Sequence, residues 1–296
     1  MKKVFITGST GLVGTNLISK LTDFNFFVYK KNHLIEIRQE IVLHLAGKAH
    51  DLRQISNESI YYDVNTELTK KVFDIFLESE AKVFITISSV KAVADVLNSI
   101  LVEDYNPSPI THYGKSKLFA ERYILSQKIP NGKRVYILRP CMIHGPGNKG
   151  NLNLLYKLVS KGIPWPLGAF ENKRSFCSID NLIFIIKELI EREDILSGVY
   201  NVADDEALST NDVISILAES QKRKPKIWKF PKGLIQSLAK LGDILHLPLT
   251  TERMQKLTES YVVSNQKIKS AIGKDLPVSA KDGLLKTFNS FHKSAK

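Results

Sequence analysis

Short runs of apolar and often β-branched residues recur along the first half of the chain. Five of these runs have the length and composition of buried strands, and they lie at residues 4–7, 26–29, 41–47, 83–87 and 135–138. Between the third and fourth runs, residues 58–79 carry apolar side chains at helical spacing. Strands that alternate with helices predict an α/β fold with a doubly wound parallel sheet.

Composition and charge narrow the class of protein. The 296 residues are 43% hydrophobic, and they include neither a cleavable apolar leader nor an apolar run long enough to span a bilayer, so we expect a cytoplasmic globular protein. The net charge of +12 comes from scattered Lys and Arg, with one cluster at 221–226. That cluster lacks interleaved aromatics, which favours a solvated surface over nucleic-acid binding. Cys141 and Cys177 have no metal spacing, and we expect both to be buried.

The first strand leads into a glycine-rich turn and then a helix. Glycines at this position let a diphosphate approach the amides at the helix N-terminus. An ordinary turn between a strand and a helix is the alternative. The turn predicts a dinucleotide site made by Gly8, Thr10, Gly11, Leu12, Val13 and Gly14.

The next strand ends supply further candidates for cofactor binding. Lys30 follows the second strand, where an acidic residue would suit the ribose hydroxyls of NAD and a basic one suits the 2′-phosphate of NADP. We therefore expect NADP or NAD, with NADPH favoured, although a surface lysine can also be merely solvated. The third strand ends at Leu45, Ala46 and Gly47, whose small residues let the backbone come close to a flat ligand.

The chain changes character at about residue 148, beyond which helices and short strands are scattered. We expect a dinucleotide-binding Rossmann unit at 1–148 and a smaller α+β substrate lobe at 149–296, with some segments of the latter returning to the first core. Residues 181–191 form an apolar helix too short to span a bilayer. Residues 234–245 are amphipathic, and we expect them to pack on the lobe rather than on a membrane surface.

Tyr113 and Lys117 are four residues apart in a predicted helix, so both side chains lie on one face. A nearby ammonium stabilises a phenolate, which makes the phenol a better acid and base near neutral pH. Ser88 and Ser89 follow the fourth strand, at the edge where ligands bind in doubly wound sheets.

Taken together, these motifs resemble the extended short-chain dehydrogenase/reductases of the NAD-dependent epimerase/dehydratase group. Other parts of the chain are similar to the bacterial reductases that act on the C4 ketone of UDP-4-keto-6-deoxy-N-acetylhexosamines for surface polysaccharides. The motifs that carry the first resemblance are Gly8/Gly11/Gly14, His44–Gly47, Asn65, Ser88–Ser89, Tyr113 with Lys117, and Arg139–Pro140. Those that carry the second are Ser88–Lys91, Gly145–Asn151, Pro166–Ala169, Arg174–Ser175 and Asp180–Leu182.

The resemblance implies a role for each residue of the site. Tyr113 would deliver a proton to the developing alkoxide, Lys117 would hold the nicotinamide ribose and lower the Tyr113 pKa, and Ser89 would bind the sugar oxygen. Ser88 and Pro140 would contact the cofactor, and Asn65 would support the network or be structural. Arg174 and Arg253 would clamp the UDP diphosphate, while Asn151 and Lys91 would make further substrate contacts, with a surface role open for Arg253 and Lys91.

The chain departs from the family in one region of the cofactor side. Only about ten residues separate the second strand from the third, so the helix and strand that usually contact adenine are largely missing. We expect a sheet that is one strand short.

Four functions fit these residues to different degrees. A dehydratase needs a carboxylate pair directly after the catalytic hydroxyl, where this chain has Val90 and Lys91. A 4-epimerase with tightly bound NAD stays open as the alternative to the reductase, and a non-catalytic dinucleotide-binding regulator is a remote one. The resemblance also implies a homodimer that pairs helices 58–79 and 113–128.

Overall fold

The computed structural model describes residues 1–296 except 32, 49–56, 149, 246–249, 295 and 296. The chain divides into two compact units. The first unit consists of Met1–Cys141, Ile179–Ala203 and Val263–Pro277. The second unit consists of Met142–Ser178, Asp204–Val262 and Val278–Lys296.

A six-stranded sheet of parallel strands forms the centre of the first unit, in the order β2-β1-β3-β4-β5-β8. The predicted α/β class with a doubly wound sheet is therefore confirmed. The strand order reverses between β1 and β3, and ligands of such sheets bind at the carboxyl ends beside this point. The strands are β1 (Lys2–Thr7), β2 (Phe24–Val28), β3 (Ile41–His44), β4 (Val83–Ile87), β5 (Arg134–Pro140) and β8 (Gly198–Val202).

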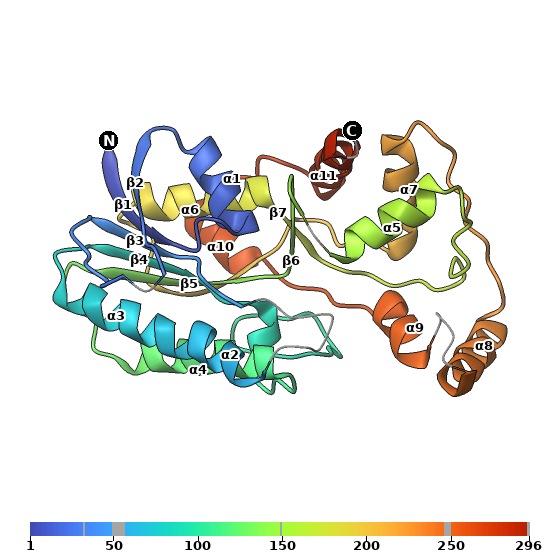
Figure 1. Ribbon diagram of the computed structural model, residues 1–296, viewed down its shortest axis with the longest axis horizontal. Helices are drawn as coiled ribbons and strands as arrows, with labels where there is room; N and C mark the ends of the chain where they lie inside the picture. Colours follow the sequence, from blue (N-terminus) through green and yellow to red (C-terminus); the bar gives the residue numbers. More distant parts are fainter. Residues whose placement is uncertain (32, 49–56, 149, 246–249, 295–296) are drawn as a thin grey trace. The chain divides into compact units, whose positions relative to one another are not determined.

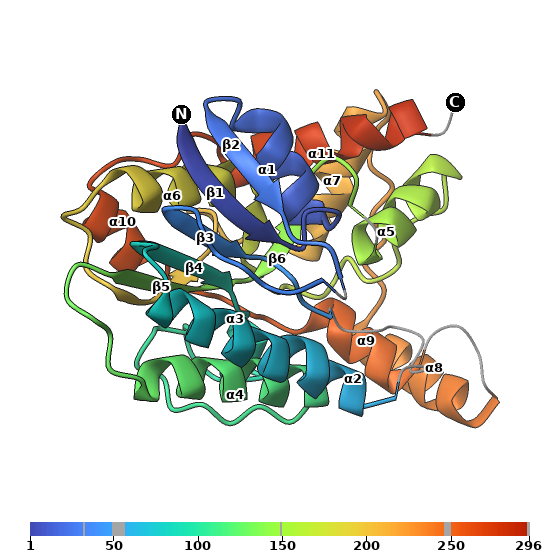
Figure 2. The ribbon, with the colours of Figure 1, turned by 60° about the vertical axis from the view of Figure 1, so that its left-hand side comes forward.

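Helices cover both faces of this sheet (Figures 1 and 2). α1 and α6 lie on one face, and α3 and α4 lie on the other, while α10 packs beside β8. The helices are α1 (Leu12–Lys20), α2 (Ser59–Tyr62), α3 (Leu68–Glu78), α4 (His112–Ser126), α6 (Ile179–Glu191) and α10 (Gln266–Ile272). The predicted helix 58–79 is confirmed as α2 and α3 joined by a π-helical segment at Asp63–Glu67.

An aromatic cluster anchors the face covered by α3 and α4. Phe73 and Phe76 of α3 pack against Phe84 of β4, with ring centroids 4.9 and 5.2 Å apart, and all three side chains are fully buried. Ile35 and Ile37, from the connection between β2 and β3, are buried in the same core. No helix or strand lies in the described part of this connection, and β2 is an edge strand. Among the described residues the sheet therefore ends at β2, in agreement with the shortness of the connection.

The second unit packs helices around a pair of short parallel strands. Its elements are β6 (Met142–His144), α5 (Asn151–Ser160), β7 (Phe176–Ser178), α7 (Thr210–Ser220), α8 (Lys232–Leu245), α9 (Thr251–Thr258) and α11 (Ala280–Ser294). Its core gathers Trp165, Phe176, Leu217 and Phe288. The 234–245 helix appears as α8, which packs on α9. Cys141 and Cys177 are both buried, as expected.

Among the described residues, no helix is both long and apolar enough to cross a bilayer. In the same part of the chain, no group of three or more His, Cys, Asp or Glu side chains is placed to hold a metal ion.

Candidate active site

The loop between β1 and α1 contains positions that only glycine fits. Gly8 has a φ of +72°, and a Cβ built there would lie 2.5 Å from the backbone nitrogen of Ala46. A Cβ on Gly14 would lie 2.4 Å from the carbonyl oxygen of Gly8. Gly11 caps the N-terminus of α1 without a side-chain hydrogen bond. The first amides of α1 are therefore left to bind an anion such as a diphosphate.

The end of β3 lies beside this loop. The backbone amides of Leu45 and Ala46 donate to the Thr7 carbonyl and to Thr7 Oγ1, at 3.2 and 3.1 Å. A Cβ on Gly47, the next residue, would lie 3.0 Å from Lys117 Nζ. The structure thus brings together two segments predicted to bind the cofactor and one predicted catalytic residue. The other candidates of this region are at least partly exposed, namely Thr10, Leu12, Val13 and Lys30.

Ser89 and Tyr113 meet at the carboxyl end of β4. Ser89 caps a 3₁₀ turn, and its Oγ accepts a hydrogen bond from Lys91 N at 3.2 Å. Thr111 caps α4 through its side chain, which places Tyr113 in the first turn of that helix. The Tyr113 phenol is hydrogen-bonded to the Ser89 side chain. The ring of Tyr61 stands edge-on to that of Tyr113, with centroids 6.3 Å apart.

The pKa of Tyr113 departs from the expectation. We expected Lys117 to lower it, but burial raises the pKa of this phenol, the Ser89 hydrogen bond opposes that rise, and Tyr61 adds to it. The Lys117 ammonium instead donates to the carbonyl oxygen of Ile87 at 2.9 Å. Tyr113 is therefore protonated near neutral pH.

Lys117 is itself buried, with only 7% of its surface exposed. Burial lowers the pKa of its ammonium to about 8, and the carboxylate of Glu121, one turn further along α4, opposes that change. Since this pKa lies above 7, most of the Lys117 population still carries its charge at neutral pH.

Glu121 is the centre of a buried polar cluster that we did not expect from the sequence. Arg139 donates to both carboxylate oxygens, at 3.0, 3.1 and 2.6 Å, and Ser88 Oγ donates to Glu121 Oε1. Glu121 and Arg139 are 2% and 4% exposed. The hydroxyl of Ser88, predicted to contact the cofactor, is thus engaged by this cluster. The signal that would have found Glu121 is its position four residues after Lys117 on the same helical face.

His44 lies behind Lys117 as a neutral, fully hydrogen-bonded side chain. Its two ring nitrogens lie 2.9 Å from the hydroxyls of Thr7 and Thr69. Burial, with a smaller contribution from the charge of Lys117, lowers the pKa of His44 to about 3.

Asn65 lies in the π-helical segment and joins three parts of the site. Its side chain accepts from Lys48 N at 2.9 Å, donates to Lys48 O at 3.1 Å and donates to Ser116 Oγ at 3.0 Å. It therefore ties the chain after β3 to α4, next to the catalytic candidates. π-helical turns are often found at functional sites.

The remaining candidates lie in both units. In the first unit, Lys91 Nζ donates to the Asp95 carbonyl at 2.7 Å, and Pro140 is buried at the end of β5. In the second unit, Arg174 is half-buried and donates to the carbonyl of Lys256 in α9, and Arg253 is exposed in the same helix. Asn151 begins α5, and its side chain lies outside the described part of the structure.

Comparison with known proteins gives matches over the whole chain. Residues 28–203 match the model of the NAD dependent epimerase/dehydratase family. The chain is 30% identical to a UDP-glucose 4-epimerase of Vibrio cholerae over 98% of its own length and 95% of the relative. It is 28% identical to an N-acetyl-α-D-glucosaminyl-diphospho-ditrans,octacis-undecaprenol 4-epimerase of Escherichia coli O157:H7, over 90% of this chain and 84% of that one.

A solved structure shares the fold. The UDP-glucuronic acid 4-epimerase of Bacillus cereus, solved with NAD, superposes with a TM-score of 0.76 over 99% of this chain and 100% of its own. The two sequences are 18% identical.

The buried His44 makes stability depend on pH. Its pKa is about 3 in the folded protein and near 6.5 when unfolded, so between these values the unfolded state binds a proton that the folded state does not. We therefore expect stability to fall as pH drops from about 6.5, by up to about 1.4 kcal/mol per pH unit from this group. The free energy of unfolding, measured with urea at several pH values, should depend less steeply on pH for His44→Gln than for the parent protein. The matched change at exposed His33, His33→Gln, should leave the slope as it is, and equal slopes for the parent and His44→Gln would contradict this account.

The Glu121 cluster makes two measurable contributions. Glu121→Gln leaves Arg139 buried without its counter-ion, and we expect a loss of stability of about 3–5 kcal/mol. It also removes the carboxylate that raises the Lys117 pKa. The fall in kcat/KM expected as Lys117 loses its proton, near pH 8, should therefore move to lower pH.

Thermal unfolding and pH–rate profiles test these two effects. The control is Glu78→Gln, at an exposed position of α3, which should change neither. The double variant Glu121→Leu/Arg139→Met removes both charges and should recover most of the lost stability. An unshifted alkaline limb in a folded Glu121→Gln protein would rule out the influence of Glu121 on Lys117.

Proposed function

The chain belongs to the NAD dependent epimerase/dehydratase family, and from this we propose that it reduces the C4 ketone of a nucleotide sugar. The substrate we propose is a UDP-4-keto-6-deoxy-N-acetylhexosamine, used in the synthesis of surface polysaccharide. The observation that carries the proposal is the hydrogen-bonded pair of Ser89 and Tyr113, together with the buried ammonium of Lys117 that is bound to the Ile87 carbonyl at the end of β4.

The residues at the carboxyl edge of the sheet fit a dinucleotide. The backbone is packed so closely at Gly8 and Gly14 that a Cβ would clash, and the uncapped first turn of α1 leaves amides for a diphosphate. Gly47 and Lys117, which lie close to each other, would hold a ribose next to Tyr113. When bound, NADPH or NADH supplies the hydride for the ketone carbon.

Tyr113 and Ser89 would handle the ketone oxygen. The Ser89 hydroxyl would hold the oxygen in place, and the Tyr113 phenol would donate the proton as the alkoxide develops. An acid must be protonated at the working pH, and burial keeps Tyr113 in that form. The same group, as its phenolate, would take the proton when a hydroxyl is oxidised, which is the step with which 4-epimerisation begins.

The residues after Ser89 disfavour dehydration. A 4,6-dehydratase needs carboxylates there to remove the C5 proton and to protonate the leaving hydroxyl. In this chain Val90 is buried, and the ammonium of Lys91 is bound to the carbonyl of Asp95. These two side chains cannot supply the pair of carboxylates that this reaction needs.

The cofactor side supports a cofactor that exchanges during turnover. β2 is an edge strand, and in the described part of the β2–β3 connection no helix or strand follows it. Lys30 and Lys31 are exposed just beyond β2, where a 2′-phosphate would find positive charge. A reductase must release its oxidised cofactor in every cycle, so the cofactor would be a diffusing co-substrate. Because of the positive charge of Lys30 and Lys31, we favour NADPH over NADH.

A 4-epimerase is the second candidate. It is favoured by the 30% identity with the Vibrio cholerae epimerase over nearly the full length of both chains. Such an enzyme oxidises C4, turns the keto sugar over and reduces it again, so it regenerates its cofactor and keeps it. The same Ser89, Tyr113 and Lys117 would serve both reactions, and the need for added cofactor separates them.

The substrate diphosphate would be held by residues of the second unit. A guanidinium binds phosphate oxygens in a fork that an ammonium does not provide. Arg174 is fixed by its bond to the Lys256 carbonyl, and Arg253 is exposed on the same helix, α9. We propose that both arginines, with Asn151, contact the nucleotide part of the substrate.

The decisive assay offers the purified protein an enzymatically generated UDP-4-keto-6-deoxy-N-acetylglucosamine with NADPH or NADH. We expect stoichiometric oxidation of the cofactor and a 6-deoxy-N-acetylhexosamine product, identified by NMR. Tyr113→Phe should lower kcat by about 10²–10⁴-fold, the usual contribution of general acid catalysis. The control is Tyr123→Phe, a change in the same helix at a hydroxyl bound to Asp74, which should keep full activity.

A different outcome of this assay would identify an epimerase. Interconversion of UDP-N-acetylglucosamine and UDP-N-acetylgalactosamine without added cofactor, and no oxidation of NADPH, would replace the reductase by the epimerase. Undiminished activity in Tyr113→Phe would refute the proposed role of Tyr113 in either reaction.

We further propose a homodimer that pairs α2, α3 and α4 with their counterparts. Ile60 and Phe119 are 38% and 45% exposed on these helices, and Tyr62 packs against Phe119 with ring centroids 5.9 Å apart. We expect light scattering at micromolar concentration to give the mass of a dimer. Phe119→Glu would place a charge on both sides of the interface and should give the mass of a monomer, while a monomeric parent protein would refute the proposal.

A further inference from the structure

α8 carries apolar side chains on two sides. Ile235, Ala239 and Gly242 are buried against the second unit. A second row, spaced four, three and four residues apart, is 45 to 57% exposed, and we call it the leucine stripe: Leu234, Leu238, Leu241 and Leu245. Each of these leucines keeps about half of its surface in solvent, whereas Ile235 and Ala239 of the buried row belong to the core of the second unit.

The residues just before α8 extend the exposed apolar surface. Trp228 and Phe230 are 52% and 37% exposed, and their rings stand edge to face with centroids 5.8 Å apart. The backbone of Trp228 is fixed by a hydrogen bond from its amide to the Trp165 carbonyl at 2.8 Å. Tryptophan in such a position is typical of the boundary between apolar and aqueous phases.

Positive charge surrounds these apolar residues. Residues 221–245 contain a single acidic residue, Asp243, and their net charge of +6 is half that of the whole chain. The segment runs from the end of α7 into α8 (Figure 1). Seven basic residues are exposed along it, and we call them the basic set: Lys222, Arg223, Lys224, Lys226, Lys229, Lys232 and Lys240.

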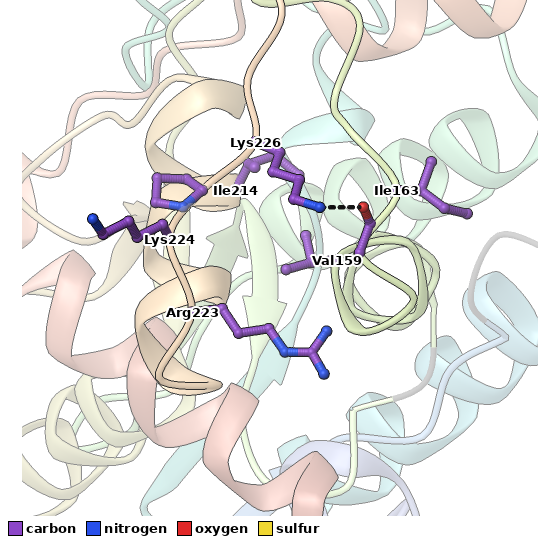
Figure 3. A pocket seen from close by; sticks show the side chains of 8 residues that line it. Val159, Ile163, Ile214, Arg223, Lys224 and Lys226 are labelled. Atoms are coloured by element: carbon purple, nitrogen blue, oxygen red, sulfur yellow. Dashed lines mark hydrogen bonds between the residues drawn. The ribbon is translucent and has the colours of Figure 1, made fainter.

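Part of the basic set borders a hollow at the ends of α5 and α7 (Figure 3). Arg223 Nη1 donates to the carbonyl of Ser160 at 2.7 Å, and Lys226 Nζ lies 3.4 Å from that of Gly162. Figure 3 shows the Lys224 side chain pointing away from Val159. These contacts hold Arg223 and Lys226 at the rim of the hollow, and both residues, like Lys224, stay exposed to solvent.

We propose that the leucine stripe, Trp228, Phe230 and the basic set form a docking surface for a lipid bilayer that contains anionic lipids. An amphipathic helix with such residues lies in the plane of the interface, with its apolar side among the acyl chains and its lysines at the headgroups. α8 has 14 residues, which suits this orientation and not a crossing of the bilayer.

Charge selects the bilayer over the other occupants of such a surface. A second copy related by two-fold symmetry would bring the same surface against itself, and the basic sets would then repel each other. A nucleic acid would use the cations and leave the leucine stripe in water. An anionic bilayer satisfies both the charge and the apolar area.

Vesicle binding by the full-length protein tests this proposal. We expect the protein to co-sediment with vesicles of equal parts phosphatidylglycerol and phosphatidylcholine, and not with vesicles of phosphatidylcholine alone. The two tryptophans differ in exposure, since Trp165 is 3% exposed and Trp228 is 52% exposed. A blue shift of the emission on anionic vesicles, lost in Trp228→Phe, would place Trp228 in the membrane.

Substitutions at exposed positions separate the two parts of the surface. Leu238→Ser/Leu241→Ser and, separately, Lys229→Glu/Lys232→Glu should each lower the partition coefficient about tenfold or more, and should leave turnover of a water-soluble substrate unchanged. Leu196→Ser, at a leucine of the first unit that is 80% exposed, is the matched control and should bind as the parent does. Absence of binding, equal binding to both vesicle types, or full binding by either double variant would overturn the proposal.

Discussion

The burial of the Lys117 ammonium constrains the rest of the site. Removing a charge from water is costly unless neighbouring groups replace the solvent. Here the Ile87 carbonyl accepts a hydrogen bond at 2.9 Å, and the Glu121 carboxylate lies one turn away on the same helix. Glu121 needs a partner of its own, which Arg139 supplies from the end of β5. The buried cation therefore accounts for the carboxylate on the inward face of α4 and, through it, for the arginine near the end of β5.

Much of the first unit could be predicted from the sequence, because its elements are strongly patterned. The apolar runs predicted β1, β3, β4 and β5 to within a few residues, and the short connection predicted an edge strand at β2. β2 itself begins at Phe24, earlier than the run at 26–29 indicated. The part played by β8, α6 and α10 in this unit could not be placed from the pattern, since long-range pairing leaves little trace in a local window.

The site was predictable as a set of residues but not as an electrostatic environment. Spacing and strand ends indicated Tyr113, Lys117 and the Ser88–Ser89 pair, and the family resemblance singled out Ser89, which the structure brings close to Tyr113. The predicted direction of the shift in the Tyr113 pKa was wrong, because the shift depends on how deeply the phenol is buried and on which acceptor the Lys117 ammonium binds. Glu121 was missed for a related reason, since an acidic residue on a helix normally faces water. In α8, amphipathicity predicted the packed row and gave no sign that the neighbouring leucine stripe stays exposed.

The π-helical segment at Asp63–Glu67 changes the rotational phase of a continuous helix. Before it, Tyr61 turns toward the ring of Tyr113, and within it Asn65 reaches the site. After it, Phe73 and Phe76 turn toward the sheet. A π turn is an α-helix with one residue inserted, so it moves the residues that follow by about 100° around the axis. A single extra residue thus lets one helix point Tyr61 and Asn65 toward the site and Phe73 and Phe76 toward the sheet. Without it, one of these two pairs would face away from its partners.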